Sequence, residues 1–150
     1  MDTMTLMPET APATGRLAGR KALVTGSSKG IGYGIALRLA QEGADVVVNY
    51  NSDPLGAEEL LGRIRALGRR GSSIKANLGE VADVQRLVAE SAEALGGLDL
   101  LVNNAGIEKH APFWDVTERD FDAVLDVNLK GVFFATQAFV RECQRADRPG

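Results

Sequence analysis

Three closely spaced glycines, Gly26, Gly30 and Gly32, are the residues whose spacing most directly indicates chemistry in this chain. They lie in the stretch TGSSKGIG, directly after an apolar run and directly before a helical pattern. A helix N-terminus binds anions, because it presents unpaired N–H groups and a partial positive charge. Glycines let the backbone approach a pyrophosphate without Cβ atoms in the way. The stretch therefore predicts a dinucleotide phosphate site, although a structural corner between a strand and a helix would also explain the glycines.

The spacing of these glycines differs from two common phosphate-binding motifs. The usual dinucleotide fingerprint is G-x-G-x-x-G, whereas this chain has G-x-x-x-G-x-G. No Gly-Lys-Ser/Thr follows, so the stretch is not a P-loop. The second apolar run ends at Asn49, near the offset of about 20 residues at which dinucleotide sites place a ribose-binding residue. This context favours the phosphate-site interpretation.

The rest of the chain supplies elements that would position this stretch, because apolar runs alternate with helical patterns over short connections. Continuous apolar runs at 22–24, 46–48 and 100–102 predict strands covered on both faces, and a weaker run around Ile74 and Ala76 predicts an edge strand. Apolar spacing of i, i+3, i+4 and i+7 predicts helices over 32–39, 57–64 and 81–95. Asp53 is the expected N-cap of the second helix, ahead of Pro54. A fourth helix is expected to begin at Thr117.

Composition limits the class of protein. One hundred and fifty residues, 45% apolar and 25% charged, fit a single soluble domain. A net charge of -3 gives no electrostatic reason to expect nucleic acid or a membrane as a partner. The single cysteine, Cys143, cannot form an intramolecular disulfide, and no Cys/His spacing indicates a metal site. Residues 1–16 lack the basic start and apolar run of a secretory signal, so we predict a disordered tail, a domain at 17–150 and a cytoplasmic location.

Three motifs in order make the chain, from about Leu17 to Gly150, resemble the classical short-chain dehydrogenases/reductases. The family motif T-G-x-x-x-G-I-G is matched by Thr25, Gly26, Ser27, Ser28, Lys29, Gly30, Ile31 and Gly32. The N-N-A-G motif is matched by Asn103, Asn104, Ala105 and Gly106, and a D-x-N-L-x-G-like segment spans 126–131. The resemblance implies an α/β fold of the Rossmann type, a doubly wound parallel sheet in the order 3-2-1-4 with helices on both faces. The fold would be truncated after its fourth strand–helix unit, which would leave the strand at 99–103 as an exposed apolar edge prone to aggregation.

The same resemblance implies which residues contact the cofactor. These are the glycine motif at 26–32, the segment Asn104, Ala105 and Gly106 under the ribose, and Asn77 and Leu78 beside the adenine, where the family commonly has Asp-Val. An NAD site normally carries an acid at the end of the second strand to hold the ribose 2′-OH. That end reads Asn49, Tyr50 and Asn51, so no carboxylate repels a 2′-phosphate.

Lys29, inside the glycine motif, would supply a charge that attracts a 2′-phosphate. A lysine solvated beside the loop is the alternative interpretation. We predict NADP as the cofactor, with NAD also accepted.

The catalytic groups that the resemblance implies are mostly missing from this chain. In the family a tyrosine exchanges the proton on the substrate oxygen, helped by a lysine four residues later and by a serine. The only tyrosines are Tyr33 and Tyr50, followed four residues on by Leu37 and Pro54. Asn128 alone matches the family set, as the asparagine that holds a water in the proton relay. It falls seven residues after Phe121 on an expected buried stripe, where a satisfied core amide is the other interpretation.

The resemblance also implies a substrate class. The segments VVVNY and NNAGIE, with Glu108, are similar to the glucose 1-dehydrogenase branch, and VFFATQAF is shared with 3-oxoacyl-carrier-protein reductases. We therefore expect an oxidoreductase acting on a sugar or another alcohol or ketone, with full-length relatives forming homotetramers. This chain, taken as the N-terminal part of such a domain, is expected to be inactive alone. A 3-oxoacyl-carrier-protein reductase-like member and a non-catalytic nucleotide-binding remnant are the two alternatives.

Overall fold

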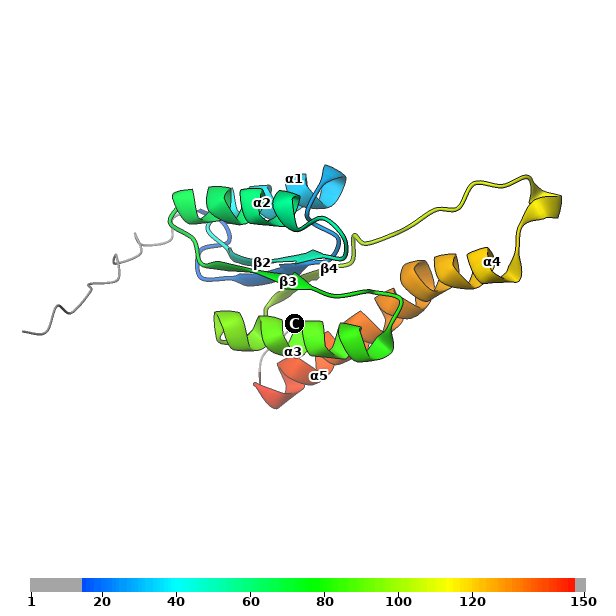
Figure 1. Cartoon of the computed structure of the whole chain (residues 1–150). Coiled ribbons are helices and arrows are strands. Elements are labelled where there is room, and N and C mark those ends of the chain that lie inside the picture. Colours follow the sequence, from blue (N-terminus) through cyan, green and yellow to red (C-terminus); the bar gives the residue numbers. More distant parts are fainter. Residues whose placement is uncertain (1–14, 148–150) are drawn as a thin grey trace, which may run out of the picture.

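The computed structural model describes residues 15–147, and its centre is a sheet of four parallel strands in the order β3-β2-β1-β4. The strands are β1 (Lys21–Val24), β2 (Asp45–Tyr50), β3 (Gly71–Lys75) and β4 (Leu100–Val102) (Figure 1). This confirms the predicted sheet, including β3 and β4 as its two edges. The predicted tail at 1–16 lies outside the described residues apart from Gly15 and Arg16.

Helices cover both faces of the sheet, as the alternating pattern predicted. One layer holds α1 (Gly30–Gln41) and α2 (Pro54–Ala66), and the other holds α3 (Val81–Leu95) and α5 (Val132–Arg145) (Figure 1). Side chains alternate along the strands, so Val46 and Val48 pack in the α1/α2 layer while Val47 packs in the α3/α5 layer. Val46, Val47 and Val48 are fully buried between the two helical layers. The continuous apolar strands are therefore explained by a helical layer on each side.

Strand register brings the carboxyl ends of the strands to one edge. Val24 of β1 pairs with Val48 of β2 and with Val102 of β4. The segments that follow these residues therefore begin at the same level, and Asn49 pairs with Ile74 of β3 one residue later. In an open parallel sheet this edge is where ligands bind.

Two of the predicted helix caps are present. The Asp53 carboxylate accepts a hydrogen bond from the Gly56 N–H at 3.0 Å, with Pro54 in the first turn of α2. Thr117 Oγ1 accepts from the Asp120 N–H at 3.1 Å and so caps α4 (Glu118–Leu125). Asp120 Oδ2 lies 3.0 Å from the Thr117 hydroxyl, so the returning bond goes to the side chain rather than to the backbone.

The fourth helix differs from the prediction in two ways. It is divided into α4, a π-helical segment η2 (Asp126–Gly131) and α5, and the stripe around Phe121 is not buried. Phe121 is 55% exposed and Asn128 is exposed, so the expectation of a buried stripe was wrong. The physical reason is that α5 packs on α3, with Ala135 in the shared core, whereas no described helix or strand of the sheet layers covers α4.

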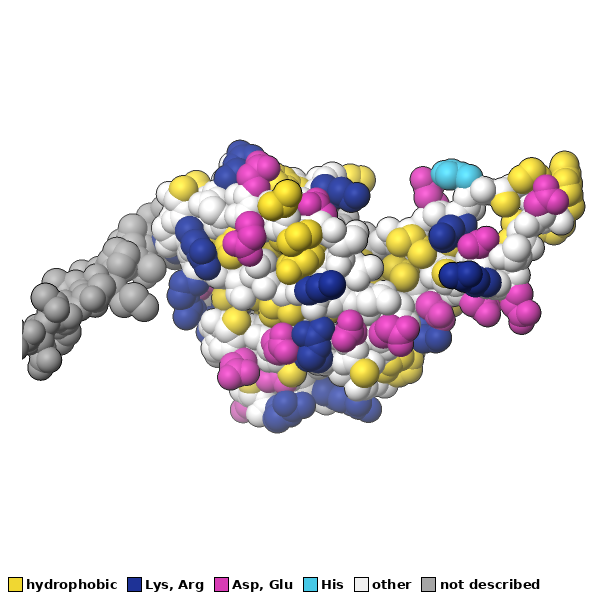
Figure 2. Space-filling view, in the orientation of Figure 1, with side chains coloured by type: hydrophobic (Ala, Val, Ile, Leu, Met, Phe, Trp, Pro, Cys, Tyr) yellow, Lys and Arg dark blue, Asp and Glu magenta, His cyan; other side chains and the backbone are white. Residues whose placement is uncertain are grey.

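The connection from β4 to α4 extends away from the sheet (Figure 1). It includes a short 3₁₀ turn, η1 (Phe113–Asp115), where Phe113 is 91% and Trp114 83% exposed. In the space-filling view this segment forms the projecting apolar tip on the right (Figure 2). By length and composition alone the run Glu118–Arg145 could cross a membrane, but its Ala135 and Cys143 are buried in the domain.

Candidate functional site

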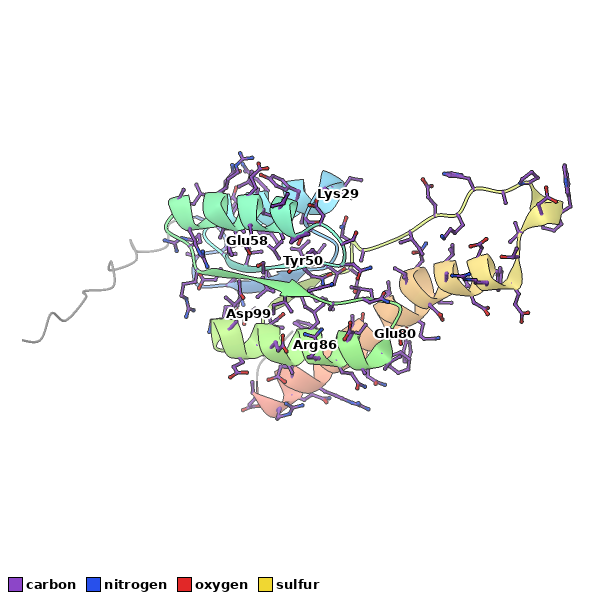
Figure 3. The ribbon with its side chains drawn as sticks, in the orientation of Figure 1. Lys29, Tyr50, Glu58, Glu80, Arg86 and Asp99 are labelled. Carbon is purple, nitrogen blue, oxygen red and sulfur yellow. The ribbon has the colours of Figure 1, made fainter. Side chains whose placement is uncertain are left out.

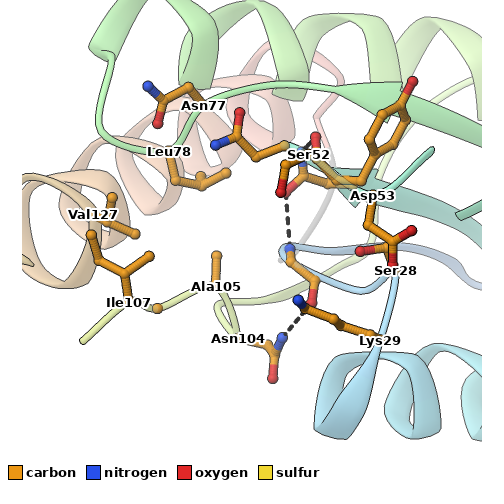
Figure 4. Close-up of a pocket in the computed structure, with 15 residues that line it drawn as sticks. Ser28, Lys29, Ser52, Asp53, Asn77, Leu78, Asn104, Ala105, Ile107 and Val127 are labelled. Carbon is orange, nitrogen blue, oxygen red and sulfur yellow. Dashed lines mark hydrogen bonds between the residues drawn. The ribbon is translucent and has the colours of Figure 1, made fainter. Parts of the chain in front are cut away.

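A cavity of about 370 Å³ lies at the carboxyl edge of the sheet, where the segments after all the strands converge (Figure 4). Its lining comes from the glycine loop, the ends of β2 and β3, the segment after β4 and the π-helical segment. The lining residues are Gly26, Ser28, Lys29, Asn49, Tyr50, Asn51, Ser52, Asp53, Asn77, Leu78, Asn104, Ala105, Gly106, Ile107 and Val127. Most of the predicted cofactor residues therefore meet around one space.

The glycine loop requires glycine at two positions for different reasons. Gly26 has a φ of 59°, in the left-handed region, and a Cβ there would lie 2.8 Å from the Ala105 Cα. A Cβ on Gly32 would lie 2.3 Å from Asn104 Nδ2. Gly32 therefore serves the close contact between α1 and the segment after β4.

The N-terminus of α1 is open, unlike that of α2. Lys29 is the N-cap residue, its side chain makes no capping bond, and the first turn of α1 contains no acid. The α2 N-terminus is instead capped by the Asp53 carboxylate. Helix N-termini without a side-chain partner leave N–H groups for water or a ligand. The end of α1 beside the cavity is therefore suited to an anion.

Asn49 lies at the end of β2 and is 1% exposed. Its Oδ1 accepts from the Gly26 N–H at 2.9 Å, and its Nδ2 donates to the carbonyls of Ile74 and Ala76 at 3.2 and 3.4 Å. The side chain borders the cavity, yet its polar atoms are occupied by backbone groups. The position at which the sequence predicts a ribose ligand is thus filled by an amide that holds the sheet and the glycine loop together.

Asn104 approaches the same loop from β4. Its Nδ2 donates to the carbonyls of Thr25 and Gly26, both at 2.9 Å. The Thr25 hydroxyl in turn accepts from the backbone N–H groups of Asn104 and Ala105, both at 3.0 Å. The N-N-A-G segment is therefore fastened to the glycine loop by reciprocal hydrogen bonds.

The rim beyond β2 is polar and carries few charges. Among the lining residues only Lys29 and Asp53 are charged, and the Asp53 carboxylate is engaged in capping α2. Figure 3 shows Lys29 at the start of α1 and Tyr50 at the end of β2. Asn51 and Ser52 are exposed beside them. The lining thus offers one lysine, one carboxylate that caps α2, amides and hydroxyls, and Lys29 is the group in it that can pair with a phosphate.

Asn77 and Leu78 form the wall of the cavity after β3. The Asn77 side-chain oxygen accepts from the Gly79 N–H at 3.0 Å, and the backbone N–H of Asn77 donates to Asp83 Oδ2 at 2.9 Å. This bond from the Asn77 backbone, together with a hydrogen bond from the Arg86 side chain, lowers the pKa of the Asp83 carboxyl. The turn that carries Asn77 is therefore held by a carboxylate in the first turn of α3.

Asn128 lies just outside the lining, behind Gly106. Its Oδ1 accepts from the Ile107 N–H at 2.9 Å, and its Nδ2 donates to the Ile107 carbonyl at 2.8 Å. It sits within the π-helical segment η2, and π-bulges are frequent at functional sites. The side chain therefore positions the segment after β4.

Sequence reasoning and structure differ at the borders of the site. The predicted residues Ser27, Gly30, Ile31 and Gly32 do not line the cavity: Ser27 is buried, with its hydroxyl donating to the Val24 carbonyl, and Ile31 is 79% exposed. The structure adds lining residues that the sequence analysis did not select, namely Ser52, Asp53, Ile107 and Val127. Adjacency to Asn51, Gly106 and Asn128 was the available signal for these.

Comparison with known proteins gives one consistent result. A profile of the short chain dehydrogenase family matches residues 20–149. A hydroxynaphthalene reductase-like protein of Metarhizium majus is 46% identical over 121 residues, which are 81% of this chain and 45% of that protein. A short chain dehydrogenase/reductase of Aspergillus aculeatus is 40% identical over 132 residues, 88% of this chain and 50% of that protein. The chain therefore spans about half the length of the curated relatives it matches.

Solved structures agree with the sequence comparison. A short chain dehydrogenase from Burkholderia cenocepacia in complex with NADP superposes with a TM-score of 0.84 at 47% identity, covering 85% of this chain and 52% of that one. A blue fluorescent protein from a metagenomic library in complex with NADPH gives a TM-score of 0.81 at 38% identity, covering 89% and 53%.

Proposed function

The chain belongs to the short-chain dehydrogenase family, and from this premise we propose that it binds NADP as the cofactor-binding part of an oxidoreductase. The observation that carries the proposal is the uncapped N-terminus of α1, which opens beside a cavity lined by amides and Lys29. Pyrophosphate binds at such helix ends. When bound, the nicotinamide would accept or donate a hydride.

The residues present fit a dinucleotide in three parts. The open N–H groups at the start of α1 would hold the pyrophosphate, and a cavity wall from Asn77 and Leu78 would face the adenine. Lys29, with Asn51 and Ser52 beside it, would hold the 2′-phosphate. Asp53 is the carboxylate among the lining residues, and it lies at the start of α2, where its Oδ1 accepts the capping hydrogen bond from Gly56. These features support NADP over NAD, with NAD bound more weakly.

Proton transfer has no group in this chain comparable to the family tyrosine. The Tyr33 hydroxyl donates to Glu59 and accepts from Arg63, both at 3.0 Å, on the outer surface of α1 and α2. Tyr50 borders the cavity, but Pro54 stands where a lysine partner would be needed. We propose that the chain binds the dinucleotide and does not reduce a substrate by itself.

The substrate is proposed to be an alcohol or carbonyl compound, with glucose as the first candidate. That preference rests on VVVNY and on NNAGIE with Glu108, which is exposed on the extended segment. A hydroxynaphthalene-type aromatic ketone is the second candidate, favoured by the 46% identity to hydroxynaphthalene reductase-like proteins. The same fold supports both, because pockets rather than folds determine function.

The experiment measures binding before turnover. NADP and NAD are titrated into the purified chain by calorimetry, and tighter binding of NADP is expected. No binding of either at millimolar concentration would contradict the proposal. The chain is then assayed with NADP and glucose, with NADPH and a hydroxynaphthalene-type ketone, and with NADPH and a 3-oxoacyl thioester. Binding without turnover is expected; turnover by the chain alone would show that the missing tyrosine is not required.

A further inference from the structure

The side chains of Asn49 and Asn104 bind the two backbone polar groups of Gly26 in the glycine loop. The Gly26 N–H donates to Asn49 Oδ1 and the Gly26 carbonyl accepts from Asn104 Nδ2, each at 2.9 Å. Gly26 itself has a left-handed φ of 59°. The two asparagines come from β2 and β4, on either side of β1 in the sheet. The loop is thus held from both neighbouring strands.

Additional bonds fix the following residue to β2. The Ser27 N–H donates to the Asn49 carbonyl at 2.8 Å, and the Asn49 N–H donates to Ser27 Oγ at 3.2 Å. The Asn49 side chain also reaches the far strand, through the carbonyls of Ile74 and Ala76. The neutral amide accepts from Gly26 and donates to β3 at once, which an ionised carboxylate at this position could not do because it has no N–H to donate.

We infer that Asn49 is a positioning residue for the pyrophosphate: it consumes the Gly26 N–H and fixes the glycine loop, so that the later N–H groups at the start of α1 face the ligand. Asn49 would then act on the cofactor through Gly26 and not by touching the ribose. This inference rests on the proposed dinucleotide function. It differs from an ordinary core role because it separates ligands that have a pyrophosphate from ligands that lack one.

The physical basis is preorganisation. A loop already held in its bound conformation loses less conformational freedom when the ligand binds, so its affinity is higher. Removing the Asn49 side chain would release Gly26 and let its N–H compete for the anion in other loop conformations. Of the residues proposed to contact adenosine 2′-monophosphate, Asn77 and Leu78 lie on the segment after β3 and outside the glycine loop, so that ligand should depend less on the Gly26 bond than NADP does.

The test compares two ligands in two variants. NADP contains the pyrophosphate, whereas adenosine 2′-monophosphate contains only the adenosine and the 2′-phosphate. Asn49→Ala should weaken NADP about tenfold, the scale of one hydrogen bond, and change adenosine 2′-monophosphate less than about twofold. Asn103→Ala is the matched control, because Asn103 bonds Thr136 and does not line the cavity. Equal losses for both ligands, or no loss, would overturn the inference.

If Asn49→Ala does not fold, a measurement on the unaltered chain tests whether the Gly26 N–H stays bonded to Asn49 when NADP binds. In a ¹⁵N NMR titration with NADP, the amides of Gly30, Ile31 and Gly32 should shift, while the Gly26 amide shifts little and stays protected from exchange. A large shift of Gly26 with loss of protection would overturn the inference and leave the proposed function intact. Absence of any NADP binding would overturn both.

Discussion

The side-chain amide of Asn128 and the backbone of Ile107 bind each other through a matched pair of hydrogen bonds, at 2.9 and 2.8 Å. The bonds join η2 to the segment after β4 across 21 residues of sequence. The bonds hold Ile107 in place at the start of the segment that extends from the sheet toward α4. Asn128 therefore shapes the wall of the cavity although it does not line it.

Asn128→Ala should loosen that wall. It removes both bonds to Ile107, and because the pair is exposed we expect a loss of about 1 kcal/mol in unfolding free energy. Urea denaturation measures this loss, and faster exchange of the Ile107 amide should accompany it. Asn103→Ala, which removes one bond to Thr136, is the comparison. An unchanged Ile107 exchange rate would contradict the positioning role.

Lys29→Ala should weaken the binding of NADP without weakening the binding of NAD. If Lys29 holds the 2′-phosphate, NADP binding weakens by about 1–3 kcal/mol, the scale of a charged hydrogen bond, while NAD binding is unchanged. Calorimetric titration of both cofactors measures the difference. Lys109→Ala is the control, because Lys109 is an exposed lysine that pairs with Asp120 away from the cavity. Equal losses for NADP and NAD would show that Lys29 does not distinguish them.

Gly32→Ala and Gly34→Ala offer a matched pair in one helix. A Cβ on Gly32 would lie 2.3 Å from Asn104 Nδ2 and 2.7 Å from the Gly26 carbonyl oxygen, so the loop must shift. We expect a loss of about 1–3 kcal/mol in stability from overpacking, together with weaker NADP binding. A Cβ on Gly34 meets nothing within 4 Å, so Gly34→Ala should stabilise α1 by about 0.5–1 kcal/mol. Thermal unfolding of both variants is the measurement, and equal effects would refute the packing argument.

The lowered pKa of the Asp83 carboxyl predicts that the stability of the chain depends on pH in the acid range. Its pKa is lowered by the hydrogen bond from the Asn77 N–H and by Arg86, so its folded pKa lies below the unfolded one. The stabilisation is therefore present above the usual carboxyl pKa of about 4 and is lost as the pH falls through the lower folded value. At pH 7 the Asp83→Asn variant should be less stable than the parent chain. Between pH 5 and pH 2.5 its free energy of unfolding should fall less than that of the parent chain. Parallel pH profiles of the two unfolding midpoints would rule this out.

The exposed apolar side chains on η2 and α5 predict that the chain associates with itself. Leu129 and Phe133 are 64% and 60% exposed, and β4 is an edge strand of the described sheet. Patches of this kind mark interaction surfaces or aggregation sites. Sedimentation should show concentration-dependent association of the chain, reduced in Leu129→Lys/Phe133→Lys. A monomer at all concentrations that unfolds cooperatively would contradict the prediction.

The sequence alone determined the elements and their order, because those depend on local patterns. Continuous apolar runs marked the strands, Asp53 and Thr117 marked two helix starts, and the glycines marked the turn after β1. Each signal extends over a few neighbouring residues, so it can be read without knowing the fold. The alternation of strand and helix patterns indicated a parallel sheet, and the strand order followed from the family resemblance.

The tertiary structure decided what individual side chains do at the site. Asn49 looked like a ribose ligand at its sequence position, but it bonds Gly26, 23 residues earlier, and carbonyls of the following strand. Phe121 was expected to be buried from its helical spacing, yet it is 55% exposed. Periodicity gives a helix an apolar face, but whether that face is covered depends on residues far away in sequence. Hydrogen bonds between distant segments, such as Asn104 to Gly26, are likewise set only when the strands meet at one edge.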